Sequence, residues 1–383
     1  TGHAFGLLLL RGAEAALSGA RTIADLAVRH LAAANPGGVR HLPEILCEEA
    51  PAETPGVPPI DIAALEAALT RAPGPWRGLA FARDDRLPWV RHPQRALPSD
   101  PPAVSVLIPT RDRGDLLARA VETLFAVTRY PDLEVLILDN DTTCPETIAL
   151  MERLGTRGVR RICCPGPFNF AAINNRGVGE ARGDLVCLLN NDVEITEPGW
   201  LATMVGELLR PGIGCVGAKL LWPGGMVQHA GVALGIDGGA QHVGVGWAGD
   251  DPGYCGLNRA TRRVSAVTAA CLLLRRADWL ALGGMDAEAF PVTFNDVDLC
   301  CRMRRAGKAV VWTPEARLLH HESASRGGDT LPQKAARARR ELEALRRRWG
   351  EDLAADPFYN PNLNRDAVPY EGLALPPGPR GAR

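Results

Sequence analysis

The sequence lacks an excess of charge of either sign. It has 43 Lys and Arg residues against 44 Asp and Glu residues, which gives a formal net charge of −1 over 383 residues. A nearly neutral chain has no long-range field that would draw it to nucleic acid or to an anionic membrane. We therefore expect no nucleic-acid partner, and any bound anion must be held by a local group of side chains.

Long hydrophobic runs are also missing. The apolar run at the start of the chain, residues 5–10, is far shorter than the roughly 20 residues that span a bilayer, and no signal-peptide layout precedes it. These features predict a cytoplasmic protein without a transmembrane segment, and they leave open a peripheral association with the inner face of the membrane. Because the chain begins at Thr1, we expect a processed chain or a fragment of a longer one.

The ten cysteines show no metal-binding or redox spacing. No CxxC occurs, and two pairs are directly adjacent in the chain, at Cys163–Cys164 and Cys300–Cys301. Neighbouring cysteines cannot readily bridge to each other, and no zinc pattern emerges from the spacing. We therefore expect free thiols, as is usual in a reducing cytoplasm.

The first hundred residues differ in texture from those that follow. Residues 13–34 carry an Ala-rich helical pattern, residues 62–70 predict a second helix, and the proline-rich remainder is typical of a linker. No catalytic constellation occurs in this stretch. We expect an N-terminal region at 1–100, a main domain at 101–330, and a C-terminal basic helix with an extended tail at 331–383.

From residue 103 onward, strand and helix patterns alternate. This order is typical of an α/β fold in which helices flank a mostly parallel sheet in three layers. The predicted strands are 104–110, 133–138, 159–163, 185–189, 213–221, 264–274 and 309–312. The predicted helices are 115–127 with Asp115 as its N-cap, 145–154, 170–181, 200–209, one that starts near Asp296, and 333–349.

Three of the predicted strands end in polar side chains. These are Thr110, Arg111 and Asp112 after the first strand, Asp139 after the second, and Asn190, Asn191 and Asp192 after the fourth. Asn and Asp are also favoured in plain turns. However, ligands of open α/β sheets gather just beyond the carboxyl ends of the strands. Three polar ends at one edge of the sheet therefore predict a nucleotide site.

A second informative segment follows residue 294. Asp296 can cap a helix that Gly307 ends, and Asp298 stands four residues before Arg302, so the two can pair across one turn. Further on, His320 and His321 are adjacent on an extended segment. Successive side chains of a strand point to opposite faces, so at most one of these histidines should face a common site.

Two further regions have roles that the residues alone leave open. Glycines crowd residues 224–256, where loops can approach a ligand closely, and we expect acceptor selection there and in residues 264–274. Candidates are Gln228, His229 and Thr268. The basic helix at 333–349 is either a solvated face or a cover for a pyrophosphate.

Five segments, in order, resemble the family 2 glycosyltransferases with the GT-A fold. The likeness is to the bacterial branch, rhamnosyltransferases among them, that builds O-antigen and other cell-surface polysaccharides. It covers about residues 103–330. The segments are VSVLIPTRDR (104–113), EVLILDNDT (134–142), PFNFAAINNRG (167–177), LLNNDVEI (188–195) and NDVDLCCRMRRAGKAVVWTPEARLLHHES (295–323).

The resemblance implies that a sugar moves, with inversion, from a nucleotide-diphosphate donor to an acceptor hydroxyl. A UDP- or dTDP-sugar is the expected donor, and a glycan or lipid-linked glycan is the expected acceptor. In the family the first strand end packs on the base, the acidic end of the second strand accepts a hydrogen bond from it, and two asparagines line the ribose and phosphates. The implied nucleotide-sugar-binding residues are Pro109, Thr110, Arg111, Asp139, Asn169, Asn175, Asn190 and Asn191.

The resemblance also implies a metal site and a general base. Asp192 ends the counterpart of the Asp-x-Asp motif and would coordinate Mg²⁺ or Mn²⁺, with His320 completing the metal shell. Asp296 takes the place of the base, and Asp298 is the alternative, although we favour it as a partner of Arg302. The chemistry asks for the same groups, because a departing diphosphate needs a hard cation and an attacking hydroxyl needs a base.

Two departures from the family pattern concern this site. Asn190 and Asn295 stand where the family has Asp and Glu, and we expect weaker ion binding but retained activity. A catalytically silent module that binds nucleotide sugar or glycan is the alternative interpretation. A nucleotidyltransferase is a third, but no Gly-rich, Lys-bearing phosphate loop follows the first strand. Residues 41–51 resemble the tail of a preceding glycosyltransferase domain, which would make the chain part of a tandem enzyme.

Overall fold

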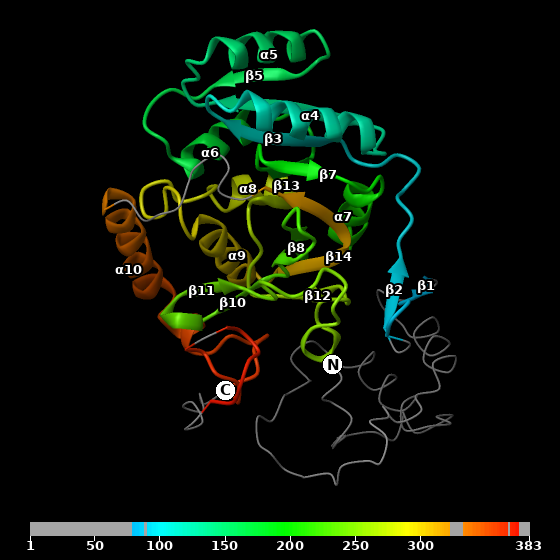
Figure 1. Cartoon of the computed structure of the whole chain (residues 1–383), viewed down its shortest axis with the longest axis vertical. Coiled ribbons are helices and arrows are strands. Elements are labelled where there is room, and N and C mark those ends of the chain that lie inside the picture. Colours follow the sequence, from blue (N-terminus) through cyan, green and yellow to red (C-terminus); the bar gives the residue numbers. More distant parts are fainter. Residues whose placement is uncertain (1–78, 88–89, 322–331, 367, 375–383) are drawn as a thin grey trace. The chain divides into compact units, whose positions relative to one another are not determined.

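The computed structural model describes residues 79–87, 90–321, 332–366 and 368–374 (Figure 1). Contacts divide the chain into two units, one of Thr1–Arg95 with Pro252–Ala260 and one of Ala96–Asp251 with Thr261–Arg383. The helices expected at 13–34 and 62–70 lie outside the described residues. The proposed origin of residues 1–100 in a preceding domain stays a prediction.

In the first unit, β1 (Ala80–Arg83) and β2 (Arg91–Gln94) form an antiparallel hairpin. The Asp84 carboxylate accepts hydrogen bonds from Leu87 N at 2.8 Å and from Arg259 Nε at 2.6 Å. Burial raises the pKa of Asp84, but the bonds from Arg259 and Leu87 outweigh it and hold the pKa well below its ordinary value. The ion pair ties residues 252–260 to this hairpin.

The second unit starts with a parallel half-sheet. Its strands are β3 (Val104–Thr110), β4 (Leu133–Asp139), β5 (Arg160–Cys163) and β6 (Leu185–Leu189), in the order β6-β3-β4-β5. The connecting helices are α4 (Gly114–Val127), α5 (Pro145–Gly155) and α6 (Phe170–Glu180). The strands β3 and β6 are buried along most of their length because helices cover the sheet, which explains their continuous apolar runs.

The other half of the sheet is mixed. Strand β13 (Cys271–Arg275) runs antiparallel between β6 and β8 (Ile213–Leu221), and β14 (Ala309–His320) is parallel to β8. The strand expected at 309–312 therefore continues to His320, with a register shift between Thr313 and Arg317. The remaining strands at this end are β7 (Val193–Ile195), β9 (Val227–His229) and β12 (Arg262–Arg263), and β10 (Val232–Leu234) and β11 (Ala240–His242) form a separate hairpin.

The helices of this half are α7 (Trp200–Leu208), α8 (Arg276–Ala281), α9 (Asn295–Arg305) and α10 (Pro332–Ala354). Gly307 ends α9 with φ of 77°, as expected. Neither predicted acidic cap is correct. Arg113 precedes α4 without a side-chain cap, and Phe294 precedes α9 with φ of 61°, which leaves Asp296 inside the first turn.

Close packing joins α6 to the sheet. A Cβ atom added at Gly177 would lie 2.5 Å from a methyl of Leu138, so only glycine lets the helix approach β3 and β4 this closely. The strand expected at 264–274 begins only at Cys271, and the residues just before it line the cavity described below. The α/β architecture thus agrees with the sequence prediction, and the reversal of β13 is the main addition.

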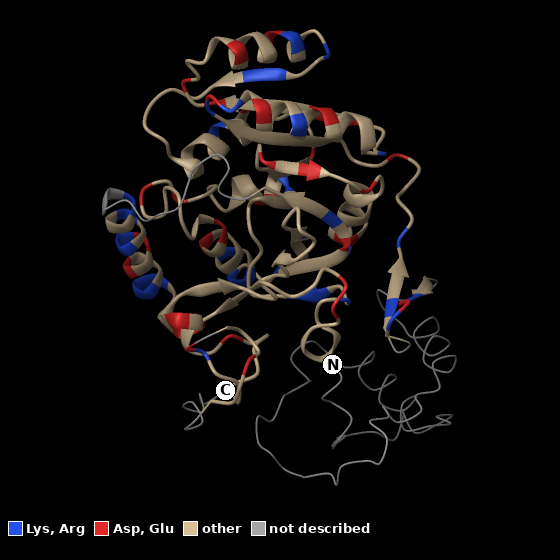
Figure 2. Cartoon of the chain, in the orientation of Figure 1, with Lys and Arg blue, Asp and Glu red and all other residues tan. Residues whose placement is uncertain are grey.

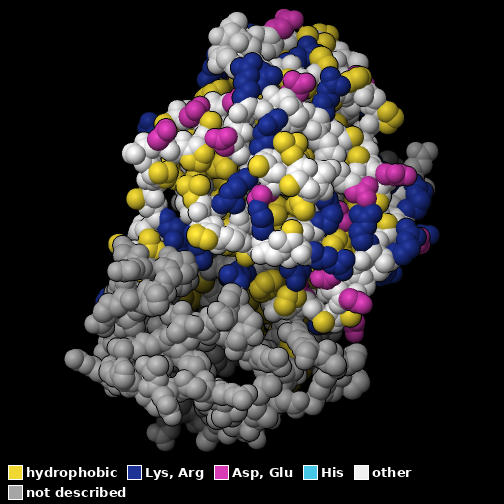
Figure 3. All heavy atoms as spheres, turned by 180° about the vertical axis from the view of Figure 1, so that it is seen from behind, with side chains coloured by type: hydrophobic (Ala, Val, Ile, Leu, Met, Phe, Trp, Pro, Cys, Tyr) yellow, Lys and Arg dark blue, Asp and Glu magenta, His cyan; other side chains and the backbone are white. Residues whose placement is uncertain are grey.

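Charges are spread over most of the described surface. Lys and Arg residues are frequent along α10 (Figure 2), whereas basic and acidic side chains are interspersed over the face seen in Figure 3. Within the described ranges, no helix combines the length and the apolar character needed to cross a bilayer. All nine cysteines in those ranges are free thiols, as expected.

Candidate active site

A cavity of about 850 Å³ opens beyond the carboxyl ends of β3 and β6, and its size suits a nucleotide-sized ligand. Most of its lining is polar or charged. Side chains come from both halves of the sheet and from α9 and α10. The lining residues that carry the argument are Thr110, Arg111, Asn190, Asn191, Asp192, Gln228, Ala269, Asp296, His320, Lys334 and Arg337.

Hydrogen bonds join the end of β6 to the end of β3 and to the residue before β13 at the cavity wall. Asn191 Nδ2 donates to Thr110 Oγ1 at 3.0 Å, and the Asn190 amide donates to Ala270 O at 3.0 Å. Pro109 and Arg111 line the same wall. The polar strand ends predicted from the sequence therefore meet at one edge, and of these residues only Asp139 does not line the cavity.

The carboxylate of Asp192 lies against the imidazole of His320. His320 Nε2 is 3.0 Å from Asp192 Oδ1 and 3.4 Å from Asn190 Nδ2, and both Asp192 and His320 are about 95% buried. The other ring nitrogen, Nδ1, lies 2.6 Å from Gln228 Oε1. His321 points the opposite way, with Nε2 2.9 Å from Glu194 Oε2, so the two adjacent histidines separate as the strand geometry predicts.

These groups fit a hard divalent cation. An amide oxygen can only accept, so Gln228 Oε1 places the proton of a neutral His320 on Nδ1 and leaves the Nε2 lone pair facing Asp192. Neighbouring ligands of an octahedral Mg²⁺ site, each about 2.1 Å from the ion, stand about 3 Å apart, which is the spacing of Nε2 and Oδ1.

The protein contributes only part of such a coordination shell. In the described portion of the chain, no group of three or more His, Cys, Asp or Glu side chains is arranged to hold a metal. Mg²⁺ commonly takes one or two protein ligands and completes its shell with water and substrate phosphates. The Asp192–His320 pair therefore suits an ion that binds together with a diphosphate.

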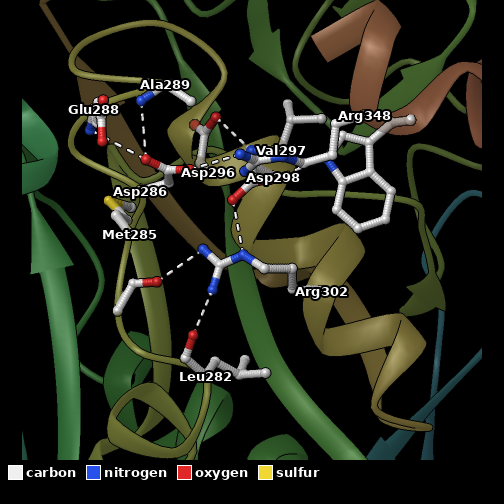
Figure 4. Close-up of polar contacts among 12 residues, drawn as sticks. Leu282, Met285, Asp286, Glu288, Ala289, Asp296, Val297, Asp298, Arg302 and Arg348 are labelled. Atoms are coloured by element: carbon white, nitrogen blue, oxygen red, sulfur yellow. Dashed lines mark hydrogen bonds and ion pairs between the residues drawn. The ribbon is translucent and has the colours of Figure 1, made fainter. Parts of the chain in front are cut away.

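Asp296 lies in the first turn of α9 (Figure 4), and it lines the cavity. Its Oδ2 accepts a hydrogen bond from Ala269 N at 3.0 Å and its Oδ1 accepts one from Val297 N at 2.8 Å. In the described residues, both of its hydrogen-bond partners are backbone amides, and no cationic side chain pairs with it. A carboxylate that is oriented in this way and still partly exposed can accept a proton from a bound hydroxyl.

Asp298, two residues later, is completely buried and is paired with cations (Figure 4). Arg302 Nε donates to its Oδ2 at 2.8 Å, while Arg348 Nη1 and Trp349 Nε1 donate to Oδ1 at 2.9 and 3.0 Å. The expected pairing of Asp298 with Arg302 is therefore confirmed. Asp298 does not line the cavity, so its carboxylate cannot take the place of Asp296.

Three of the predicted nucleotide-binding residues do not line the cavity. Asp139 is buried, and its Oδ2 accepts hydrogen bonds from Arg161 Nε at 2.9 Å and Nη2 at 2.5 Å. Asn169 caps α6 through Ala172 N, and Asn175 bonds both the N and the O of Met285. These side chains hold the cavity wall, and their contact with a nucleotide remains a prediction.

Sequence reasoning gave Gln228 a different role and gave no role to Glu341. The Glu341 carboxylate on α10 accepts hydrogen bonds from the amides of Val292 and Thr293, just before α9. Burial raises the pKa of Glu341 above its ordinary value, and the bonds from Thr293 and Val292 only partly oppose this. No local pattern marks either residue, because each acts through a partner about 50 to 90 positions away in the chain.

The comparison with protein families fits this geometry. Residues 101–350, which include the whole cavity lining, match the model described as glycosyltransferase like family 2. The chain belongs to this family. The match extends past the segments that suggested it and includes most of α10, so Lys334 and Arg337 lie within the family domain.

Individual relatives of this glycosyltransferase family 2 member are similar over more than 60% of the chain. It is 42% identical over 282 residues to the O-antigen biosynthesis protein RfbC of Myxococcus xanthus, covering 73% of this chain but 21% of that protein. It is 29% identical over 255 residues to the N-acetylglucosaminyl-diphospho-decaprenol L-rhamnosyltransferase of Mycobacterium tuberculosis (strain ATCC 25618 / H37Rv), covering 61% of this chain and 80% of that enzyme.

The fold is also found among solved glycosyltransferase structures. The crystal structure of GalNAc-T7 with UDP, GalNAc and Mn²⁺ superposes with a TM-score of 0.50 at 15% identity, covering 64% of this chain and 47% of that one. At this identity the likeness shows the fold, which is GT-A. The predicted fold class and family are thereby confirmed.

Proposed function

We propose that this chain is a metal-dependent, inverting glycosyltransferase that acts in the synthesis of cell-surface polysaccharide. The observation that carries the proposal is that Asp296 and the Asp192–His320 pair, from three separate elements, line one cavity. Asp296 provides a carboxylate that can accept the proton of a hydroxyl. The Asp192–His320 pair provides ligands for a cation beside a diphosphate. The relatives named as O-antigen and rhamnosyltransferase proteins support the substrate class.

The donor is a nucleotide-diphosphate sugar, with a UDP- or dTDP-sugar as the expected class. Pro109, Thr110 and Arg111 form a wall against which the nucleobase of the donor can pack. Asn140 lines the cavity, whereas its neighbour Asp139 does not. Lys334 and Arg337 line the cavity from α10. Their positive charges favour a diphosphate, which agrees with the role of pyrophosphate cover considered for the basic helix.

In the transfer step, the Asp296 carboxylate takes the proton of the acceptor hydroxyl. The hydroxyl oxygen forms a bond to the anomeric carbon from the side opposite the diphosphate, and the bond from that carbon to the diphosphate breaks with inversion. A divalent ion held by Asp192 and His320 would supply Lewis-acid stabilisation of the departing phosphate. Lys334 adds positive charge near the same group, which is more effective in a cavity than in water, and Arg337 adds less because its Nε pairs with Glu341 Oε1 at 3.1 Å.

A donor screen tests this proposal. The protein is incubated with individual UDP- and dTDP-sugars and Mn²⁺, and the released nucleotide product is identified. Release of nucleoside diphosphate, abolished by chelation of the metal, is the expected result. Release of pyrophosphate would instead indicate a nucleotidyltransferase. Donor binding without any turnover, with water or glycan as acceptor, would show a silent binding module and would overturn the proposal.

A further inference from the structure

A buried acidic residue on α10 lies behind the turn that leads into α9. Glu341 is 2% exposed, whereas Glu343, two residues further along the helix, is exposed. The Glu341 Oε2 atom accepts hydrogen bonds from Thr293 N and, at 3.4 Å, from Val292 N. The other carboxylate oxygen, Oε1, lies 3.1 Å from Arg337 Nε. One carboxylate therefore contacts both the turn before α9 and a basic residue of the cavity wall.

The turn that Glu341 supports leads directly into the first turn of α9. Phe294, at the N-cap position of α9, has φ of 61°, a left-handed value that a bulky side chain seldom adopts. No side-chain hydrogen bond caps the helix at this residue. A strained backbone persists only where its surroundings hold it. The hydrogen bonds from the two preceding amides to Glu341 provide such support.

Asp296 lies only two residues after Phe294, so its placement depends on this turn. Its Oδ2 is held from outside α9 by Ala269 N, whereas its Oδ1 is bonded within the helix, to Val297 N. A general base must lie within hydrogen-bond reach of the proton that it takes. A displacement of about 1 Å near a reacting group can lower a rate by about 100-fold. A small shift of the start of α9 would therefore be felt in catalysis.

The position of Glu341 does not favour stability. Burial raises the pKa of Glu341, and the hydrogen bonds from Thr293 and Val292 only partly oppose this. A carboxyl with a raised pKa in the folded state binds its proton more tightly there, so its ionised form lowers stability once the pH exceeds the unfolded value of about 4.3. Perturbed acids of this kind are more frequent at functional sites than elsewhere.

We propose that Glu341 is a positioning residue for the general base. By holding residues 292–294, it fixes the first turn of α9 and with it the Asp296 carboxylate. Glu341 does not line the cavity, so it acts through the turn and not on the substrate. This role requires an acceptor oxygen at the place of Oε2, and it does not require a negative charge. The inference deepens the proposed function and rests on it, because Asp296 is the base only in that function.

Removal of the acceptor oxygens tests the proposal. Glu341→Leu removes them from the buried face of α10, and the control Glu343→Leu makes the same change on the exposed face. In Glu341→Leu, kcat should fall by about tenfold or more while the Kd of the donor changes by less than about threefold, because the base is displaced and the wall of the donor site remains. Glu343→Leu should change neither value. An unchanged kcat in folded Glu341→Leu protein, or an equal loss in both variants, would overturn the proposal.

A second pair of variants retains an acceptor, which keeps the test decisive if Glu341→Leu weakens folding. Glu341→Gln keeps the side-chain length and one acceptor oxygen but removes the charge. Glu341→Asp keeps the charge but withdraws both oxygens by one methylene group. The kcat of Glu341→Gln should exceed that of Glu341→Asp by about fivefold or more, because the place of the oxygen decides where the base lies. The reverse order would show that the charge beside Arg337 matters instead, and would contradict the proposal.

A double-mutant cycle with Asp296→Asn separates positioning of the base from a general structural role. Turnover is measured with radiolabelled donor over hours, so that slow variants are quantified. In the Asp296→Asn background, Glu341→Asp should lower kcat further by less than about twofold, because the group that it positions is already lost. The same loss in both backgrounds would reject the role of Glu341 and leave the proposed function intact. If the unmodified protein consumes no donor, the proposed function itself fails.

Discussion

The two faces of α9 use the same residue type in opposite ways. Asp296 is partly exposed, accepts hydrogen bonds from two backbone amides, and lines the cavity. Asp298 is fully buried and accepts from Arg302, Arg348 and Trp349. The first carboxylate is available to a substrate and the second is occupied. The difference separates the group suited to catalysis from the group that holds its helix in place.

The helix α10 contributes to this difference, because its Arg348 and Trp349 donate to Asp298, whereas among the described residues Asp296 bonds only backbone amides. Arg348 donates to Asp298 and, through Nη2, to Asp286 at 2.7 Å, and its guanidinium lies 5.0 Å from the centre of the Phe290 ring. Arg302 also donates to Leu282 O and Gly284 O, which fixes the loop before α9 (Figure 4). The loop, α9 and α10 are thus joined around one buried carboxylate.

Removing the buried carboxylate should have the largest effect on stability. Asp298→Asn leaves two partly buried arginines with a neutral partner, so the free energy of unfolding should fall by about 3 kcal/mol or more. The measurement is urea unfolding. The matched control is Glu288→Gln, which removes an exposed carboxylate in the same loop and should change stability by less than about 0.5 kcal/mol. Equal, small losses in both variants would show that the Asp298 network is not structural.

A smaller effect is expected on the cavity side, at Gln228. Gln228→Leu removes the acceptor of His320 Nδ1–H, so the affinity for Mn²⁺ in the presence of nucleoside diphosphate should fall by about 10- to 100-fold. Calorimetry gives the affinity, and ¹⁵N NMR of the ring reports a changed tautomer of His320 without any metal. The control Gln241→Leu alters an exposed glutamine. An unchanged tautomer and affinity in Gln228→Leu would remove Gln228 from the metal site.

The smallest effect is expected for the ion pair between Asp286 and Arg348 of α10, and this effect depends on pH. Burial raises the pKa of Asp286, but the bonds from Ala289 N and Arg348 outweigh it, so the pKa lies below its ordinary value. A lowered carboxyl pKa stabilises the fold above the unfolded value of about 3.9 and loses this contribution as pH falls through the folded value. Asp286→Asn should therefore cost less than about 1 kcal/mol at pH 7, and the difference should shrink as the pH is lowered below about 3.9, measured by urea unfolding over this pH range. A pH-independent difference would contradict the ion pair.

The local features of the fold could be predicted from the sequence. The bounds of β3 and β8 are those expected, because buried strands have continuous apolar runs that polar residues or turns interrupt. The caps of α4 and α9 could not be predicted in the same way. Asp115 pairs with the side chain of Arg113, and Asp296 accepts from Ala269 N and Val297 N, so neither acidic residue stands at the cap position of its helix.

The residues of the site that follow directly on a strand could be predicted from the sequence. Thr110, Asn190, Asn191 and Asp192 meet because parallel strands bring their carboxyl ends to one edge. Asp139 lies at the same edge, but Arg161 on the adjacent β5 binds it, and the sequence gives no sign of that pairing. The contributions of Gln228 and Glu341 depend on how β9 and α10 pack, which is a tertiary property.

The most direct test of the central claim compares Asp296→Asn with the unmodified protein in one donor assay. The amide keeps an oxygen for Ala269 N but cannot take a proton, so kcat should fall by about 10²- to 10⁴-fold. Donor affinity and the free energy of unfolding should stay unchanged, because Asp296 is outside the Asp298 network. Retention of full turnover by a folded Asp296→Asn protein would show that Asp296 is not the base and would contradict the division of α9 into a catalytic and a structural face.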